Sequence, residues 1–291
     1  MRFVTFSYGT RLAAGVIVDD RVVDLGKAYF SWFNRPFRFD DVGAFIASGS
    51  ADRLRGEDVR SVRRDHRISH PLREVQLHAP ILRPPKIVCV GLNYRDHAEE
   101  QGIQPPASPM LFSKAPNVVI GDGDPIRIPH AISEQVDHEV ELAVVVGKEG
   151  FRIPRDRAEE VIFGYTIVND VTARDIQKKD KQFFRSKSFD TFAPMGPVVV
   201  TPDELDVGNL DVRLSVNGET RQQSNTKNLI FDVPALVEFI SAAFPLEPGD
   251  IISTGTPGGV GVYRNPPVFL KPGDVVSAEI DGIGILRNPV E

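Results

Sequence analysis

A β-rich fold is first indicated by the stretch Asp137-His138-Glu139-Val140-Glu141-Leu142-Ala143-Val144-Val145-Val146. The stretch is apolar and β-branched after its start, which predicts a buried strand. Successive side chains of a strand point to opposite faces, so Glu139 and Glu141 share a face, with Cα atoms about 6–7 Å apart. Two partly buried carboxylates at this spacing repel unless a cation neutralises them or one stays protonated. Alone, however, the pair is more typical of a solvated acidic edge strand.

Further segments of the same kind predict a fold class that is mainly β with some α. The predicted strands span residues 86–90, 163–169, 197–201, 212–216, 250–254 and 275–280. Asn217-Gly218 and Asp281-Gly282 supply residues suited to the positive φ angles of two-residue hairpin turns. The clearest helix covers residues 232–244, with Asp232 near its cap and Pro234 in its first turn.

The chain is predicted to divide into a small α+β N-terminal domain, residues 1–78, and a larger domain, residues 79–291. Within the first part, two apolar runs flank Asp19-Asp20-Arg21 as they would in a short hairpin. A charged stretch at 51–64 indicates a helix. Prolines at positions 71, 80, 84 and 85 then mark a connector between the two domains.

Composition narrows the class of protein. The 291 residues are 41% hydrophobic and 25% charged, which is typical of a globular protein with a sizeable core. A net charge of -6 without a long basic run argues against a nucleic-acid partner. The single cysteine, Cys89, excludes a disulfide framework and a thiol metal cluster. With no signal-peptide core and no apolar stretch approaching the ~18 residues of a membrane span, we expect a cytoplasmic protein.

A third carboxylate strengthens the metal hypothesis. Asp170 ends the predicted strand 163–169, where a strand delivers side chains to a rim. Three carboxylates without a thiol make a hard oxygen site, suited to Mg²⁺, Mn²⁺ or Ca²⁺ and poorly suited to structural zinc. Arg174 and Gln177 follow at i+4 and i+7, so a helix there would place both on the same face as Asp170. The simpler interpretation of Arg174 is an ordinary ion pair with Asp170.

Several lysines follow, and the sequence alone does not choose among them. The run Lys178-Lys179-Asp180-Lys181 is most simply a solvated face. A lysine beside a metal, such as Lys187, would instead hold an oxyanion, and cationic neighbours and desolvation would lower its pKa.

Several motifs in order now carry a resemblance to a known family: the chain resembles the fumarylacetoacetate hydrolase family from about residue 84 to its C-terminus. The N-terminal segment also looks like the small module of the longer members. The matching motifs are Val90-Gly91-Leu92-Asn93-Tyr94-Arg95-Asp96-His97, Glu139-x-Glu141, Asn169-Asp170, Ala173-Arg174-Asp175 with Gln177, Lys187-Ser188-Phe189, and Gly249 to Gly261.

The resemblance implies a mixed β-sandwich roll as the catalytic domain, Mg²⁺ or Mn²⁺ (with Ca²⁺ as a substitute), and a homodimer. It also implies roles for individual residues. Metal binding falls to Glu139, Glu141 and Asp170; catalysis to Lys187 and a His97-Glu100 dyad on a flexible lid; substrate binding to Arg174, Gln177 and Thr256. Thr256 lies in the glycine-rich segment 254–261, which lacks the Gly-Lys-Ser/Thr ending of a phosphate loop, so nucleotide binding is rejected.

Such a site suits a small 2-keto or 2,4-diketo acid. The leading hypothesis is hydrolysis of the C–C bond of an acylpyruvate, with the charge of the departing pyruvate enolate stabilised by the metal and Lys187, and water activated by His97 and Glu100. The same enolate forms in oxaloacetate decarboxylation, in isomerisation of a hydroxymuconate-type acid, and in dehydration of a 2-keto-3-deoxy acid. The alternative from another class is a non-catalytic module that binds metal or keto acid.

Overall fold

The computed structural model describes residues 1–54 and 59–291, and it is built around a 12-stranded sheet. Ten strands follow one path: β4 (Ser69–Pro71), β3 (Arg21–Asp24), β2 (Arg11–Val18), β1 (Arg2–Tyr8), β13 (Ala193–Val200), β11 (Ile162–Asn169), β10 (Val140–Val146), β16 (Ile251–Ser253), β6 (Ile87–Gly91) and β7 (Met110–Lys114). Off this path, β5 (Gln76–His78) pairs with β1 and β8 (Val119–Ile120) pairs with β13.

Two smaller sheets and six α-helices complete the architecture of the described residues. The four-stranded sheet has the order β15 (Glu219–Asn225), β14 (Asp211–Val216), β17 (Val275–Ile280) and β18 (Gly284–Pro289), and the two-stranded sheet joins β12 (Thr172–Ala173) to β9 (Val136–Asp137). The helices are α1 (Leu25–Phe33), α2 (Val42–Ala47), α3 (Arg95–Glu100), α4 (Arg174–Asp180), α5 (Phe183–Ser186) and α6 (Val233–Ala243). The prediction of a mainly β fold with some α is confirmed.

Strand β10 shows why the core forms where it does. It lies between β11 and β16, and all seven of its residues are buried, so it is an inner strand and not the edge strand considered above. Leu142 and Val144 join a core cluster that includes the four-stranded sheet, whereas Ala143 and Val145 join a second cluster that includes α1 and α2. Because both faces are covered, the strand is apolar throughout after Glu141.

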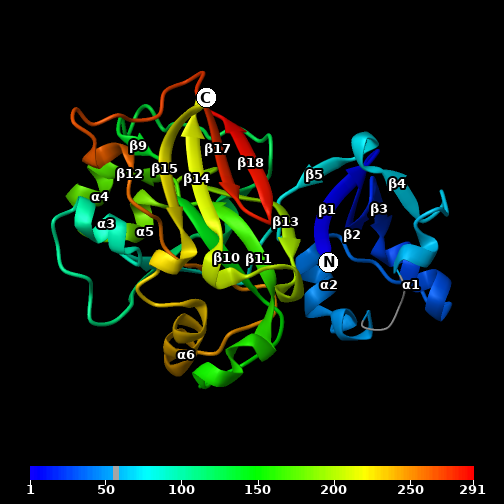
Figure 1. Cartoon of the computed structure of the whole chain (residues 1–291). Helices are drawn as coiled ribbons and strands as arrows, with labels where there is room; N and C mark the ends of the chain where they lie inside the picture. Colours follow the sequence, from blue (N-terminus) through cyan, green and yellow to red (C-terminus); the bar gives the residue numbers. More distant parts are fainter. Residues whose placement is uncertain (55–58) are drawn as a thin grey trace.

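The N-terminal residues lie on one side of the molecule, with strands β1 to β4 and helices α1 and α2 grouped together (Figure 1). The predicted hairpin is confirmed, since β2 pairs with β3 across Asp19 and Asp20. Strand β1 also pairs with β13, so the large sheet runs through the boundary expected near residue 78. The division into two domains remains a prediction.

Of the two predicted hairpin turns and the helix predicted at 51–64, one turn is confirmed. Asn217 and Gly218 both have positive φ and form the two-residue turn between β14 and β15. The second predicted two-residue turn is wrong: Asp281 to Ile283 make a three-residue connection, and of the dipeptide only Gly282 has positive φ. The helix predicted at 51–64 is also wrong in its described part, which holds two short 3₁₀ turns; residues 55–58 lie outside the described residues.

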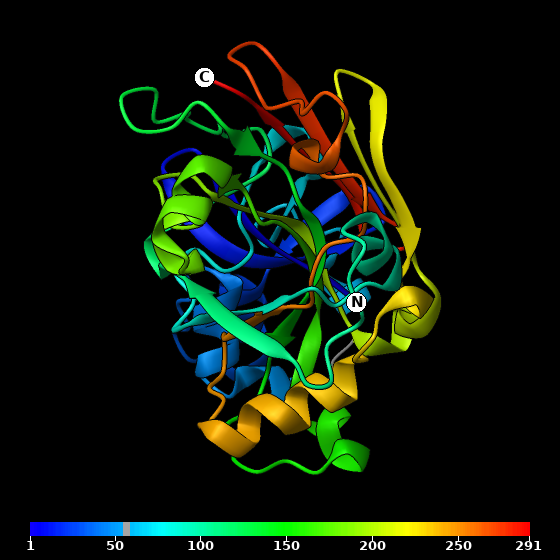
Figure 2. The same ribbon diagram turned by 90° about the vertical axis from the view of Figure 1, so that its left-hand side faces the viewer.

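Helix α6 is the predicted helix, and its cap is as expected. The Asp232 side chain accepts a hydrogen bond from the Ala235 amide, and Pro234 occupies the first turn. The helix lies at the end of the molecule away from the C-terminus in both views (Figure 2). None of the helices in residues 1–54 and 59–291 has the length and apolar character needed to cross a bilayer.

The buried face of α6 yields a stability prediction. Leu236 is fully buried, so Leu236→Ala should lower the free energy of unfolding by about 2–5 kcal/mol through lost burial and a cavity. Phe239 on the same helix is 40% exposed, and Phe239→Ala should cost less, about 0.5 kcal/mol. Urea denaturation of both variants measures this, and equal losses would contradict the assigned burial.

Candidate active site

Three carboxylates converge at one end of β10 and β11. Glu139 directly precedes β10, Glu141 lies within it, and Asp170 directly follows β11. The strands are antiparallel, with Val140 opposite Asn169, and the Asp170 amide donates to the Glu139 carbonyl at 2.8 Å. One oxygen from each side chain lies within 4.8 Å of the others, and all three residues are buried. The pairing of these strands thus brings Asp170 to Glu139 and Glu141, which are distant from it in sequence.

Two lysine ammonium groups compensate part of this charge. Lys187 Nζ donates to Glu139 Oε2 at 2.8 Å and to Asp170 Oδ2 at 2.6 Å, while Lys114 Nζ donates to Asp170 Oδ1 at 2.5 Å. Burial favours a lower pKa for Lys187, but the Asp170 and Glu139 carboxylates outweigh it and raise the pKa above its usual value. The expectation of a lowered pKa is therefore wrong, because these carboxylates favour the charged ammonium form of Lys187. For Lys114, burial prevails and lowers the pKa.

Glu141 is the carboxylate that these cations leave uncompensated. Its partners are the Ser253 hydroxyl at 2.5 Å and the Gly255 amide at 3.0 Å, and no salt bridge to it occurs within the described ranges. Burial, followed by the Asp170 and Glu139 charges, raises the pKa of Glu141 to about 8. A divalent cation would remove this penalty, and three oxygen donors suit a hard ion. The residues present therefore fit a divalent metal site.

Arg174 is placed differently from the sequence prediction. The helix α4 begins only at Arg174, after the short strand β12, so Asp170 does not share a helical face with it. Instead of pairing with Asp170, the guanidinium donates to Asp137 Oδ2 at 2.8 Å and lies 2.6 Å from Glu139 Oε1. Its Nη1 donates to Gln177 Oε1 at 3.2 Å, so Arg174 and Gln177 do lie together as predicted.

Asp137 anchors this arrangement and was missed in the sequence. Its carboxylate accepts from the Gly261 amide at 2.8 Å and the Val262 amide at 3.0 Å as well as from Arg174. Burial opposes ionisation, but Arg174 prevails and lowers the pKa of Asp137. Its position two residues before Glu139 places it at the start of the same extended segment, which is the only signal that could have identified it.

The His97 and Glu100 side chains contact each other on α3. His97 Nδ1 lies 2.9 Å from Glu100 Oε2, and the Gln101 amide nitrogen lies 2.9 Å from His97 Nε2. A Gln101 amide that donates to Nε2 implies a neutral ring with its proton on Nδ1, donated to Glu100. Glu100 Oε1 in turn accepts from the Gly259 amide at 2.8 Å, which ties α3 to the glycine-rich segment.

A glycine is required at that tie. Gly259 has a φ of +102°, and a Cβ there would lie 2.1 Å from the Arg221 carbonyl oxygen. A side chain would therefore displace the backbone whose amide holds Glu100.

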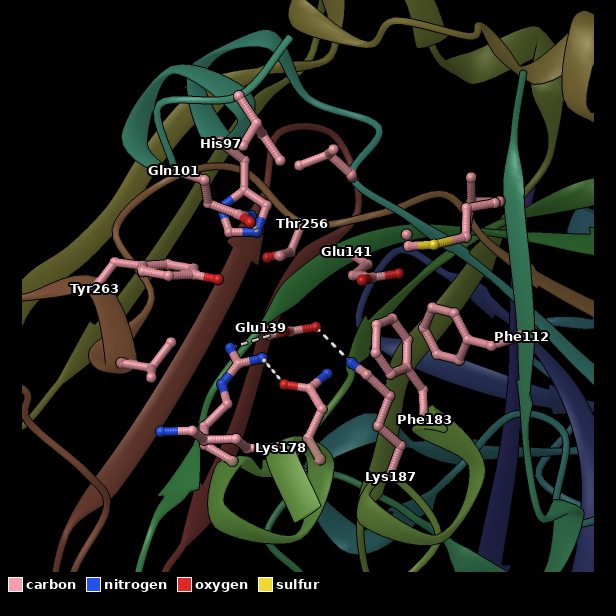
Figure 3. A pocket seen from close by; sticks show the side chains of 18 of the residues that line it. His97, Gln101, Phe112, Glu139, Glu141, Lys178, Phe183, Lys187, Thr256 and Tyr263 are labelled. Atoms are coloured by element: carbon pink, nitrogen blue, oxygen red, sulfur yellow. Dashed lines mark hydrogen bonds and ion pairs between the residues drawn. The ribbon is translucent and has the colours of Figure 1, made fainter. Parts of the chain in front are cut away.

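A cavity of about 730 Å³ brings the predicted residues together. Those that line it are His97, Glu139, Glu141, Arg174, Gln177, Lys187 and Thr256. Glu100 and Asp170 do not line it, but they contact the lining residues His97 and Lys187. Figure 3 shows His97 and Gln101 on one side of Glu139, with Lys178 and Lys187 on the opposite side. Thr256 donates to the Val140 carbonyl at 3.0 Å and accepts from Gln222, so its hydroxyl proton is already engaged.

Further lining residues were not identified from the sequence. Gln101, Phe112, Phe183 and Tyr263 are among them, and the Tyr263 ring packs edge-on against His97 at 5.9 Å between centroids. Lys114, which neutralises Asp170, ends the short strand β7 and follows no periodic pattern that would single it out.

The chain is similar to several known proteins along much or all of its length. The sequence model described as "Fumarylacetoacetate (FAA) hydrolase C-terminal" matches residues 86–291. Oxaloacetate tautomerase YisK of Bacillus subtilis is 43% identical over 300 residues, covering 100% of both chains. Mitochondrial oxaloacetate tautomerase fahd2 of Xenopus laevis is 49% identical over 219 residues, covering 74% of this chain and 68% of its own length. The structure of a fumarylacetoacetate hydrolase from Exiguobacterium antarcticum superposes with a TM-score of 0.84 at 38% identity, covering 100% and 99%.

Metal binding should be coupled to proton release. Near neutral pH, binding of Mn²⁺ is expected to release about one proton, because Glu141 is protonated below its pKa of about 8 and must ionise to become a ligand. The release should fall as the pH rises above about 8. Calorimetry in two buffers with different ionisation enthalpies measures it. Glu141→Gln should bind weakly without proton release; an undiminished release in this variant would show that the proton comes from another group.

Proposed function

The chain belongs to the fumarylacetoacetate hydrolase family, and on that premise we propose that it is a metal-dependent tautomerase that interconverts the enol and keto forms of a small 2-keto acid, represented by oxaloacetate. This differs from the hydrolysis expected first from the sequence. It combines the substrate of one alternative, oxaloacetate, with the proton transfer of another, isomerisation. The full-length likeness to a protein named oxaloacetate tautomerase supports it.

The observation that carries the proposal is the placement of the His97 imidazole, paired with Glu100, and the Lys187 ammonium group on opposite sides of one cavity (Figure 3). Tautomerisation needs a group that takes a proton from carbon and a group that stabilises charge on the neighbouring oxygen. His97 can do the first and Lys187 the second. Hydrolysis needs, in addition, a water molecule held in position for attack.

Glu139, Glu141 and Asp170 would hold Mg²⁺ or Mn²⁺, with Ca²⁺ as a substitute. The ion supplies Lewis acidity to the carboxylate and keto oxygens of a bound 2-keto acid. The residues around it would orient the substrate. Because Arg174 Nη1 holds Gln177 Oε1, the amide NH₂ group of Gln177 is left to donate to a substrate oxygen.

His97 transfers the proton in the proposed reaction. In the keto-to-enol direction, His97 Nε2 leaves its Gln101 partner and takes a proton from C3, and the C3–H electron pair forms the C2–C3 double bond. The C2–O π electron pair moves onto the keto oxygen, which takes a proton from solvent water, and the His97 imidazolium returns its proton to solvent. Glu100 holds the Nδ1 proton and stabilises the imidazolium that forms. The Lys187 ammonium stabilises the negative charge on the keto oxygen. The enol-to-keto direction reverses each transfer.

Hydrolysis of an acylpyruvate is the second candidate. Two observations favour it: the likeness to a fumarylacetoacetate hydrolase along the whole chain, and a cavity of about 730 Å³, which has room for a longer acid. Decarboxylation, dehydration and a binding-only role remain less favoured alternatives. Homodimer assembly, a cytoplasmic location and the identity of the native metal remain predictions from the sequence.

Stopped-flow decay of the enol absorbance of oxaloacetate tests the proposal. The protein with Mn²⁺ should accelerate tautomerisation above the spontaneous rate, and His97→Ala should reduce the enzymatic rate by about 10²–10⁴-fold through loss of the base. Lys187→Ala should reduce it by about 10²–10³-fold. Lys179→Ala, which removes an exposed lysine outside the cavity, is the control and should leave the rate unchanged.

The same samples should be tested for pyruvate release from acylpyruvates. Faster pyruvate release than enol decay would overturn the tautomerase proposal in favour of hydrolysis. No turnover of any 2-keto acid would favour a binding module.

A further inference from the structure

Lys178 and Lys181 line the cavity, whereas Lys179, between them in sequence, does not. All three lysines are exposed, so the solvated face expected for this run is confirmed. Lys178 and Lys181 therefore lie where the cavity meets solvent. Neither Lys178 nor Lys181 belongs to the metal cluster or to the proton transfer described above, so their presence at the cavity needs another explanation.

Neither ammonium group is neutralised by a neighbouring carboxylate. Asp180, the nearest acid in sequence, pairs instead with Arg185 at 2.5 and 2.6 Å. In the part of the chain that the structure describes, no salt bridge involves Lys178 or Lys181. By contrast, the cavity cations Arg174 and Lys187 are both held by carboxylates. The two lysines thus give the cavity positive charge that is free to meet an anion.

The backbone at Lys181 also departs from the usual choice of residue. Lys181 directly follows α4 as its C-cap with a φ of +55°, in the left-handed region where glycine or asparagine is favoured at a helix C-terminus. A lysine in this conformation is uncommon and mildly strained. Such strain at a residue that lines a cavity is consistent with a role for the side chain.

Another part of the cavity wall is apolar. Ile103, Met110, Phe112 and Phe183 line the cavity and offer a substrate no charged partner. Polar side chains such as Gln135 and Tyr263 line other parts of the wall. Of the lysine and arginine side chains that line the cavity, Arg174 and Lys187 are already paired with carboxylates, and Lys178 and Lys181 are not. A carboxylate at the distal end of a substrate would therefore be matched best by these two lysines.

We propose that Lys178 and Lys181 bind a second carboxylate, at the end of the substrate remote from the keto-acid group, and so select dicarboxylic 2-keto acids. This inference rests on the proposed tautomerase function and names its substrate class. The two lysines act on binding: they contact the distal carboxylate and leave the reacting C2, C3 and keto oxygen to the residues already described.

The test compares two substrates that differ in one charge: oxaloacetate and its 4-ethyl ester. Lys178→Gln and Lys181→Asn should each raise the KM for oxaloacetate by about threefold to fivefold while changing kcat by less than about twofold, because an exposed charge pair is lost. The KM for the ester should change by less than about twofold. Asparagine is chosen at position 181 because it tolerates the left-handed backbone.

Lys179→Gln is the matched control, since it removes the same charge from the same helix outside the cavity. It should leave both KM values unchanged, and salt should raise the oxaloacetate KM of the wild-type protein more than that of the double variant Lys178→Gln/Lys181→Asn. An unchanged oxaloacetate KM in both single variants, or an equal rise for the ester, would overturn the inference alone. A wild-type protein that tautomerises neither substrate would overturn the proposed function and the inference with it.

Discussion

The burial of three carboxylates within 4.8 Å of one another is the constraint on which the rest of the site depends. Like charges in a buried setting must be matched by cations or protons. Lys187 and Lys114 match Asp170, and Lys187 and Arg174 match Glu139. Glu141 is left for a divalent ion or a proton. The identity and position of each of these cations therefore follow from a single electrostatic requirement.

The residues that meet this requirement come from segments that are distant in the chain. The carboxylates come from the ends of β10 and β11, the lysines from β7 and the residue after α5, and the imidazole from α3. Amides of the glycine-rich segment donate hydrogen bonds to the Asp137 and Glu100 carboxylates and so connect the walls of the cavity. Because these contacts connect strand ends, loops and helices, the sheet acts as the rigid frame that keeps the base and the cation on their separate sides of the cavity.

Local patterns were predictable, and contacts between distant segments were not. The shared face of Glu139 and Glu141 follows from the period of a strand, and the turn at Asn217-Gly218 follows from residues that tolerate positive φ. The family motifs brought His97, Lys187 and Thr256 to one site. The prediction that Asp170 shares a helical face with Arg174 is wrong, because strand β12 lies between Asp170 and the start of the helix at Arg174. The α4 lysines are exposed as predicted, but Lys114 and the position of Lys178 and Lys181 at the cavity were missed, since sequence does not show which lysine faces a cavity.

The pairing of β1 with β13 gives the N-terminal strands a protective role. Arg2 and Phe3 of β1 lie opposite Val200 and Val199, the end of the run Val198-Val199-Val200 in β13. Without β1, these valines would form a bare apolar edge, open to pairing with the same edge of another molecule. The segment that carries none of the assigned site residues thus shields the larger part of the chain from aggregation.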